Sequence, residues 1–161
     1  MKERLERRAA DNAYFHPDFH GALSCGIEYL DAQYGAEAVR GYLRTFARTY
    51  YAPLREALRA RGLAALKDHF EALYRAEGGE AAFALTADEL VIRVEACPAV
   101  RHMRARGYPV ACLFHETTRT VNEALCEGTP YAAELAAYDP ETGSGVQRFH
   151  RRAPAAAGEE A

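Results

Sequence analysis

Two adjacent glycines, Gly78 and Gly79, separate two kinds of hydrophobic pattern in this chain. Before them, apolar residues recur every three or four positions, which is the period of an amphipathic helix. Directly after them, apolar and polar residues alternate through AAFALTADELVIRV, which is the period of a strand. A run of helices followed by strands is typical of the α+β class.

Three helices are expected before the glycines, over residues 17–35, 36–61 and 63–77. Pro53 is expected to kink the second helix near Tyr50. Gly21 and Gly26 lie inside the first helix, where glycine is unfavourable, so they predict close packing against another element. Residues 1–13 are highly charged and are expected to form a short or frayed lead-in helix.

Two hairpins and two more helices are expected after the glycines. The first hairpin turns at residues 86–88; a helical capping box there is the alternative, but the β-branched run VIRV favours a strand. Helices over 98–106 and 109–127 follow, and a second hairpin turns at DPETG. The predicted fold is α+β, with N-terminal helices packed on one face of a four-stranded antiparallel sheet made of two hairpins. Residues 1–152 are expected to form a single domain, and residues 153–161 a disordered tail.

The composition of the chain argues against nucleic acids and membranes as binding partners. The 161 residues carry a net charge of −3, whereas nucleic-acid-binding domains usually carry a basic excess, so no nucleic-acid partner is expected. No apolar run reaches the roughly 18–20 residues that span a bilayer, and the N-terminus lacks the apolar core of a signal peptide. We therefore expect a cytoplasmic protein without a membrane partner, in which the four cysteines are free thiols, ligands or nucleophiles.

The segment from Cys97 to Cys126 holds three of the four cysteines. Cys112 is expected in the first turn of the 109–127 helix, where the helix dipole favours a thiolate. His115 follows three residues later, and a thiol next to an imidazole is suited to nucleophilic catalysis. The alternative is that Cys112 is simply a small buried residue.

The same segment suggests a metal site. Cys97, His102, Cys112 and His115 supply two thiols and two imidazoles, a donor set that suits zinc. Their spacing is not that of a zinc finger, so a site requires the turn after Cys97 to approach the next helix. The alternative is that both histidines are exposed and never meet.

A second histidine pair, His16 and His20, has the four-residue spacing of helical metal ligands. Pro17 places His16 before the helix, so we expect a partly buried His20 instead of a metal site.

Arginines in the C-terminal half suggest a ligand that bears a carboxylate, because guanidinium groups bind carboxylates through paired hydrogen bonds. Arg101 and Arg104 lie on the predicted short helix and Arg119 on the following one. Thr118 and Asn122 share a face with Arg119 and are unfavourable in helices, which indicates that this face lines something polar.

A stripe of arginines follows the polar face of the 36–61 helix: Arg40, Arg44, Arg48, Arg55 and Arg59. Such stripes are usually solvated surface, but like charges four residues apart repel. An acidic partner surface, an anionic ligand or a subunit contact would relieve the repulsion.

Residues 80–152 contain a strand that ends in Cys97-Pro98, a short helix, a helix that carries Cys112, and a closing hairpin that ends near Phe149. This order resembles the L-2-amino-thiazoline-4-carboxylic acid hydrolase family and, more remotely, the 4-vinyl reductase (V4R) type of small-ligand domain. The resemblance implies an α+β fold that often dimerises, with a pocket between helices and sheet. It further implies hydrolysis of a small cyclic carbon–nitrogen bond, or plain ligand or metal binding. The last strand, GVQRFHRR, lacks the cysteine usual in V4R domains, which argues against carrying over a zinc site.

We therefore predict a small cytoplasmic hydrolase that acts on a C–N bond of a carboxylate-bearing heterocycle or amide. Cys112 or Cys97 would be the nucleophile, or a ligand of a zinc or other metal that activates water, and His115 or His102 would transfer the proton. The candidate substrate-binding residues are Arg119, Arg101, Arg104, Thr118 and Asn122. The alternatives are a non-catalytic sensor domain that binds a small ligand or metal, and a structural subunit whose arginine stripe docks a partner. A homodimer is expected.

Overall fold

The computed structural model describes residues 17–153 of the chain. Its elements follow in the order α1 Asp18–Tyr34, α2 Ala36–Tyr50, α3 Ala52–Arg61, α4 Leu63–Ala76, β1 Glu80–Leu85, β2 Glu89–Ala96, α5 Pro98–Ala105, α6 Glu116–Cys126, β3 Tyr131–Tyr138 and β4 Gly145–Arg151. The predicted α+β class, with N-terminal helices, is confirmed. Within the described residues no helix is long and apolar enough to cross a membrane.

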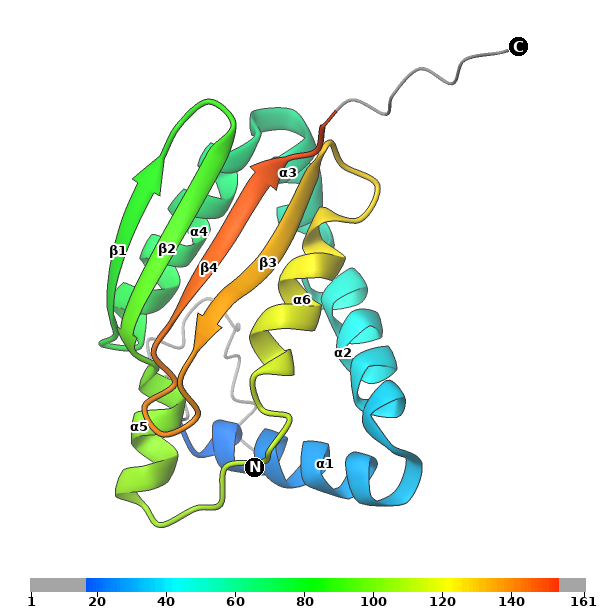
Figure 1. The fold of residues 1–161 in the computed structure, drawn as a ribbon, viewed down its shortest axis with the longest axis vertical. Helices are drawn as coiled ribbons and strands as arrows, with labels where there is room; N and C mark the ends of the chain where they lie inside the picture. The colour runs from blue at the N-terminus through cyan, green and yellow to red at the C-terminus, as the bar shows by residue number, and fades with distance from the viewer. Residues whose placement is uncertain (1–16, 154–161) are drawn as a thin grey trace, which may run out of the picture.

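The four strands form one antiparallel sheet in the order β1-β2-β4-β3, so the two hairpins join through β2 and β4. Helices α3, α4 and α6 cover one face of this sheet (Figure 1). Alternate residues of β2 point to that face, and Leu90 and Ile92 have no exposed surface. The opposite face carries polar side chains, among them Arg148, which bonds to Glu89 and Glu134 on the neighbouring strands.

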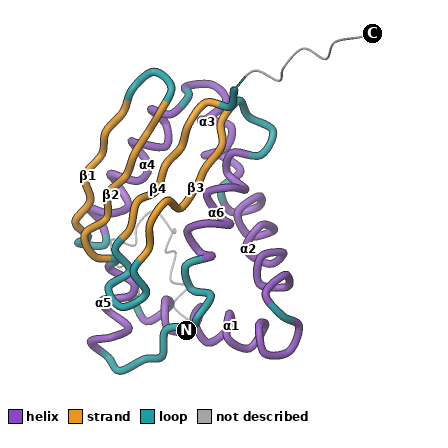
Figure 2. The backbone as a smooth tube through the Cα atoms, in the orientation of Figure 1, coloured by secondary structure: helices purple, strands orange, loops and turns teal. Residues whose placement is uncertain are grey.

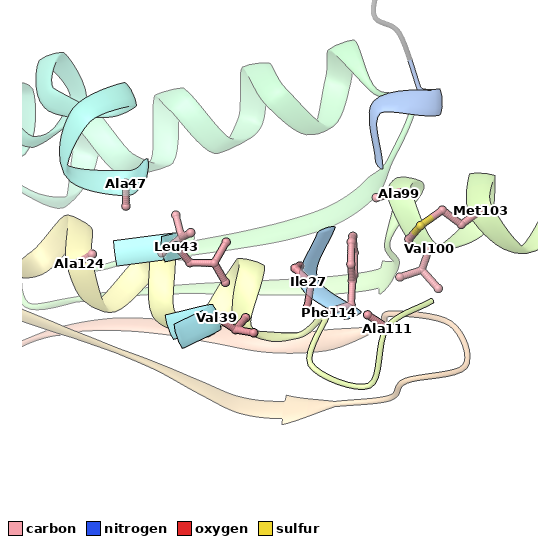
Figure 3. Close-up of a cluster of buried hydrophobic side chains, with 11 residues drawn as sticks. Ile27, Val39, Leu43, Ala47, Ala99, Val100, Met103, Ala111, Phe114 and Ala124 are labelled. Atoms are coloured by element: carbon pink, nitrogen blue, oxygen red, sulfur yellow. The ribbon is translucent and has the colours of Figure 1, made fainter. Parts of the chain in front are cut away.

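The core consists of two hydrophobic clusters. The first joins α1 and α2 to α5 and to the start of α6, and includes Ile27, Leu43 and Phe114 (Figure 3). The second fills the space between α3, α4 and the sheet, and includes Phe70 and Phe149. The half-buried Tyr51 packs against both clusters, and it also lies at the break between α2 and α3. The predicted kink in the 36–61 helix is therefore a complete break, with Pro53 in the first turn of α3.

The double glycine ends the helical half for steric reasons. Gly78 has a φ of 65°, which glycine adopts without strain. A Cβ on Gly79 would lie 2.8 Å from Cδ1 of Tyr74 and 3.1 Å from Cγ of Pro98. The chain can pass between α4 and α5 only because Gly79 has no side chain.

The predicted 109–127 helix begins later than expected, at Glu116, and residues 112–115 form turns instead (Figure 2). The hydroxyl of Ser24, buried on α1, donates to the Pro109 carbonyl and accepts from the Ala111 amide. These bonds hold the segment in a non-helical path, so the prediction that Cys112 lies in the first helical turn is wrong.

The close packing predicted for two glycines of α1 is confirmed for only one. A Cβ on Gly21 would lie 2.9 Å from the ring of Tyr108, whereas a Cβ on Gly26 would meet nothing within 4 Å. The predicted lead-in helix, His16 and nearly all of the predicted disordered tail lie outside the described residues.

Candidate functional site

A cleft of about 360 Å³ lies where the start of α1, the end of α4 and one side of α5 meet. The three elements belong to one end of the molecule, near the start of β1 (Figure 1). The polar residues that line the cleft are His20, Glu77, Arg101 and His102, and the apolar ones are Pro17, Ala76, Pro98 and Ala105. This volume lies within the usual range for small-molecule sites.

Helix α5 supplies one wall of the cleft. Cys97 is extended and precedes the helix, and Pro98 occupies its first turn, where a missing amide hydrogen has no cost. Arg101 and His102 then follow on adjacent positions. One guanidinium nitrogen of Arg101 donates to the carbonyl of Gly78 at 2.8 Å, which fixes the arginine against the end of α4.

His102 is paired with a carboxylate of α1. Its Nε2 lies 2.9 Å from Oδ1 of Asp18, and the Tyr108 hydroxyl lies 3.4 Å from the same oxygen. An ionised carboxylate only accepts hydrogen bonds, so the Nε2 of His102 is the donor. The pair connects α5 to the first residue of α1.

His20 and Glu77 form a second, more buried pair on the other side of the cleft. Nε2 of His20 lies 3.9 Å from Oε2 of Glu77, and their side chains are 18% and 13% exposed. Burial raises the pKa of Glu77, whereas burial and the nearby charge of His102 lower the pKa of His20. The shift of Glu77 brings its pKa toward neutrality, whereas the shift of His20 keeps its imidazole neutral and able to accept a proton at neutral pH.

Cys97 lies just behind this cleft, next to Pro98, and faces a separate internal cavity. Burial raises the pKa of its thiol, and this effect outweighs the hydrogen bonds from the backbone amides of Val100 and Ala99. Cys97 therefore stays a neutral thiol at neutral pH, which is opposite to what a thiolate nucleophile requires.

The internal cavity measures only about 30 Å³, room for a water molecule or two and too little for a substrate. Thr118 lines it, together with Tyr74 and Gln147. The amide of Asn122 donates to Oε1 of Gln147 at 2.8 Å, and Nε2 of Gln147 donates to the Tyr74 hydroxyl at 3.0 Å. Thr118 thus lines this cavity and Asn122 bonds to Gln147, which also lines it, but neither residue lines the cleft.

Cys112, His115 and Arg119 lie apart from the cleft, at the start of α6. Cys112 is exposed, so the alternative that it is a small buried residue is wrong. Nδ1 of His115 lies 3.1 Å from the backbone oxygen of Cys112, so this nitrogen bonds the main chain and not the thiol. Arg119 lies 3.8 Å from Oε1 of the buried Glu116.

The four residues proposed for zinc do not come together. Among residues 17–153, no three histidine, cysteine or acidic side chains are arranged so that they could hold a metal ion. Cys97 and His102 lie near the cleft, whereas Cys112 and His115 lie at the start of α6. The segment between them is held against α1 by Ser24, which keeps the two halves of the set apart.

Arg104 points away from the cleft, although it lies one turn after Arg101. Its guanidinium lies 3.5 Å from the carbonyl of Pro140 and 3.5 Å from a carboxylate oxygen of Glu141, in the turn between β3 and β4. It therefore links α5 to the second hairpin.

The arginine stripe finds its acidic partner within the same chain. Arg40 donates to Glu116 at 3.0 Å, and Arg44 and Arg48 lie 3.2 and 2.8 Å from the carboxylate of Glu127. Arg55 donates to the backbone oxygen of Glu127. The repulsion along α2 is thus relieved by α6 and the residue after it.

No family model matches the chain, and no curated protein matches it in sequence. The resemblance to the L-2-amino-thiazoline-4-carboxylic acid hydrolase family therefore stays a prediction. The assignment of a site depends on the geometry of the residues themselves.

Sequence reasoning identified only part of the cleft. Arg101 and His102 were candidates, and His20 is partly buried as expected, but Asp18 and Glu77 were missed. Glu77 directly precedes the double glycine, and a carboxylate at a helix C-terminus is unfavourable with the helix dipole. That mismatch is the one signal in the sequence that could have drawn attention to Glu77.

Proposed function

We propose that this chain is a hydrolase that cleaves a carbon–nitrogen bond of a small carboxylate-bearing heterocycle or amide in the cleft of α1, α4 and α5. The observation that carries the proposal is the placement of Arg101 next to His102 on one wall of this cleft. A guanidinium binds a carboxylate through paired, charge-assisted hydrogen bonds. An imidazole gives or takes a proton near neutral pH.

The resemblance of residues 80–152 to the L-2-amino-thiazoline-4-carboxylic acid hydrolase family supports the same class of reaction. The Cys97-Pro98 sequence that contributes to this resemblance starts α5, and Pro98 lines the cleft. One part of the resemblance, Pro98, therefore borders the proposed site, whereas Cys112 does not.

Water, and not a thiol, is the nucleophile in this proposal. The raised pKa of Cys97 keeps that thiol neutral, and Cys112 lies at the start of α6, away from the cleft lining. Hydrolysis by water needs one group to accept a proton from water and another to donate a proton to the leaving nitrogen. The cleft offers imidazole and carboxyl groups for both transfers.

The test uses L-2-amino-thiazoline-4-carboxylic acid as the probe. The wild-type protein is expected to convert it to a product heavier by one water molecule, detected by mass spectrometry. Arg101→Gln is expected to raise KM about 10- to 100-fold, because hydrogen bonds to charged groups contribute roughly 1.5–3 kcal/mol. Arg104→Gln is the matched control, since Arg104 faces Glu141 instead, and it is expected to keep KM near the wild-type value.

Failure of the wild-type protein to hydrate this probe, or equal effects of the two arginine variants, would contradict the proposal. Calorimetric binding without turnover, weakened by Arg101→Gln, would select a second function, a non-catalytic small-ligand sensor domain. The more remote resemblance to V4R-type small-ligand domains supports that second function. A homodimer and a cytoplasmic location also stay predictions.

A further inference from the structure

Two imidazole–carboxylate pairs border the same cleft, and neither pair lies within one element. His102 of α5 is paired with Asp18 of α1, at 2.9 Å. His20 of α1 is paired with Glu77 after α4, at 3.9 Å. Asp18 lies at hydrogen-bond distance and can orient the ring of His102, as in catalytic sites where a third group holds the base, whereas Glu77 lies near His20 at ion-pair distance.

The two pairs differ in their contact with water. The side chain of Asp18 is 49% exposed, whereas that of Glu77 is 13% exposed. A solvated carboxylate at hydrogen-bond distance stabilises a protonated imidazole, and a desolvated environment stabilises a neutral one. Burial favours the neutral form of His20, whereas the hydrogen-bond partner of His102 is a carboxylate in contact with solvent.

We propose that His20 is the general base and His102 the general acid of the hydrolysis in this cleft, with Asp18 as the positioning residue of His102 and Glu77 as the charge partner of His20. The assignment rests on the proposed function and adds the residues that perform it. It follows the general rule that two similar groups in different environments take the two opposite roles.

A water molecule forms a C–O bond to the substrate carbon, and His20 accepts the proton that this water loses. The C–N bond breaks, its electron pair stays on nitrogen, and His102 donates a proton to that nitrogen. The His20 imidazolium is then stabilised by the carboxylate of Glu77, and proton exchange with solvent restores both histidines.

The charged groups around His20 determine the direction in which its pKa should change in a variant, and this change can be measured without turnover. His20 lines the cleft together with Glu77 from the end of α4 and with Arg101 and His102 from α5, and Asp18, the partner of His102, lies two residues before His20 on α1. Burial and the charge of His102 both lower the pKa of His20. Removal of the His102 charge is therefore expected to raise it.

An NMR pH titration of the histidine ring protons in the full chain measures this directly, with resonances assigned from single His→Gln variants. The pKa of His20 is expected to lie below the ordinary value of about 6.5 and to rise in His102→Gln, where the charge of His102 is absent. His150→Gln, on the opposite face of the sheet, is the matched control and should leave it unchanged. Titration of His20 above 6.5, or no response to His102→Gln, would overturn the base assignment.

The activity test uses the same thiazoline probe. His20→Gln is expected to lower kcat by ~100-fold and to remove the rise of activity on the acidic side of the pH profile. His102→Gln is expected to lower kcat similarly and to remove the fall on the alkaline side. Loss of the opposite limb in either variant, or near wild-type kcat, would overturn the assignment.

The positioning role of Asp18 is tested by partial rescue. Asp18→Asn is expected to lower kcat by ~10-fold with KM unchanged, and Asp18→Glu to restore part of it. Asp68→Asn is the control, because Asp68 pairs with Arg61 on the surface. If the wild-type protein shows no turnover, the proposed function is contradicted. If the pKa of His20 lies above 6.5 or does not change in His102→Gln, only the assignment of the general base is contradicted.

Discussion

Glu116 is a charged side chain with no exposed surface, and it is held from several directions. Its Oε2 accepts from the hydroxyl of Thr120 at 2.7 Å, and its Oε1 accepts from Arg40 at 3.0 Å. Burial acts to raise the pKa of Glu116, but these hydrogen bonds and the charge of Arg40 outweigh it, so the pKa is lowered. Glu116 therefore folds as a carboxylate that connects α6 to α2.

Replacement of Glu116 by Gln is expected to lower the free energy of unfolding at pH 7 by about 2 kcal/mol, because a buried charge-assisted network loses its anion. Urea unfolding measures this. Since the folded pKa is lowered, the contribution is present above the unfolded pKa of Glu and disappears as the pH falls through the folded value.

Glu123→Gln, on the same helix, is the matched control for this prediction and is expected to stay within about 0.5 kcal/mol of wild type. An equal loss in both variants would show that the carboxylate of Glu116 has no special role. The account would also be contradicted if the free energy of unfolding of Glu116→Gln decreased with falling pH as steeply as that of the wild type.

The arginine stripe of α2 contacts Glu116 and Glu127, and we call this contact between α2 and the α6 region the seam. The residue types alone permit several partners for such a stripe, because a charge pattern does not show what lies opposite it. The contact is intramolecular only because the chain between them folds through α3, α4, the first hairpin and α5. Long-range pairing of this kind is set by the whole fold.

Charge reversal tests the seam. Arg44→Glu is expected to cost roughly 1 kcal/mol, since Arg44 lies 3.2 Å from the carboxylate of Glu127 and the pair is partly exposed. The combined Arg44→Glu and Glu127→Arg variant is expected to recover part of the loss in a double-mutant cycle. Chemical denaturation of the four proteins gives the coupling energy.

Size-exclusion chromatography of Arg44→Glu is the complementary check. An unchanged elution volume with reduced stability fits the intramolecular seam. A change of assembly state with stability unaffected would show that the stripe binds another chain instead.

At the level of the whole molecule, periodicity alone predicted most of the architecture. The alternation of Leu90, Ile92 and Val94 marked the central strand, and the glycines around residue 78 marked the change from helix to sheet. The late start of α6 could not be predicted, because it depends on bonds between Ser24 and residues more than 80 positions away. The order of the strands likewise depends on which hairpin edges pair.

The candidate site was harder to predict than the fold. Cys97, Arg101 and His102 are close in sequence and were considered together, whereas Asp18, His20 and Glu77 come from two distant elements. The fold brings His20 and Glu77 into the cleft that Arg101 and His102 line, and the packing of α1 against α5 places Asp18 next to His102. Cys112 drew attention through its neighbour His115, but the turn before α6 directs that imidazole to a backbone oxygen.

Chemical-shift mapping with the thiazoline carboxylate probe tests the central claim, that a small carboxylate-bearing molecule binds the cleft of α1, α4 and α5. In ¹H–¹⁵N spectra of the full chain, the largest perturbations are expected at residues 17–20, 76–78 and 98–105, and they should disappear in Arg101→Gln. Perturbations centred on residues 112–119, or none at saturating probe, would contradict the claim.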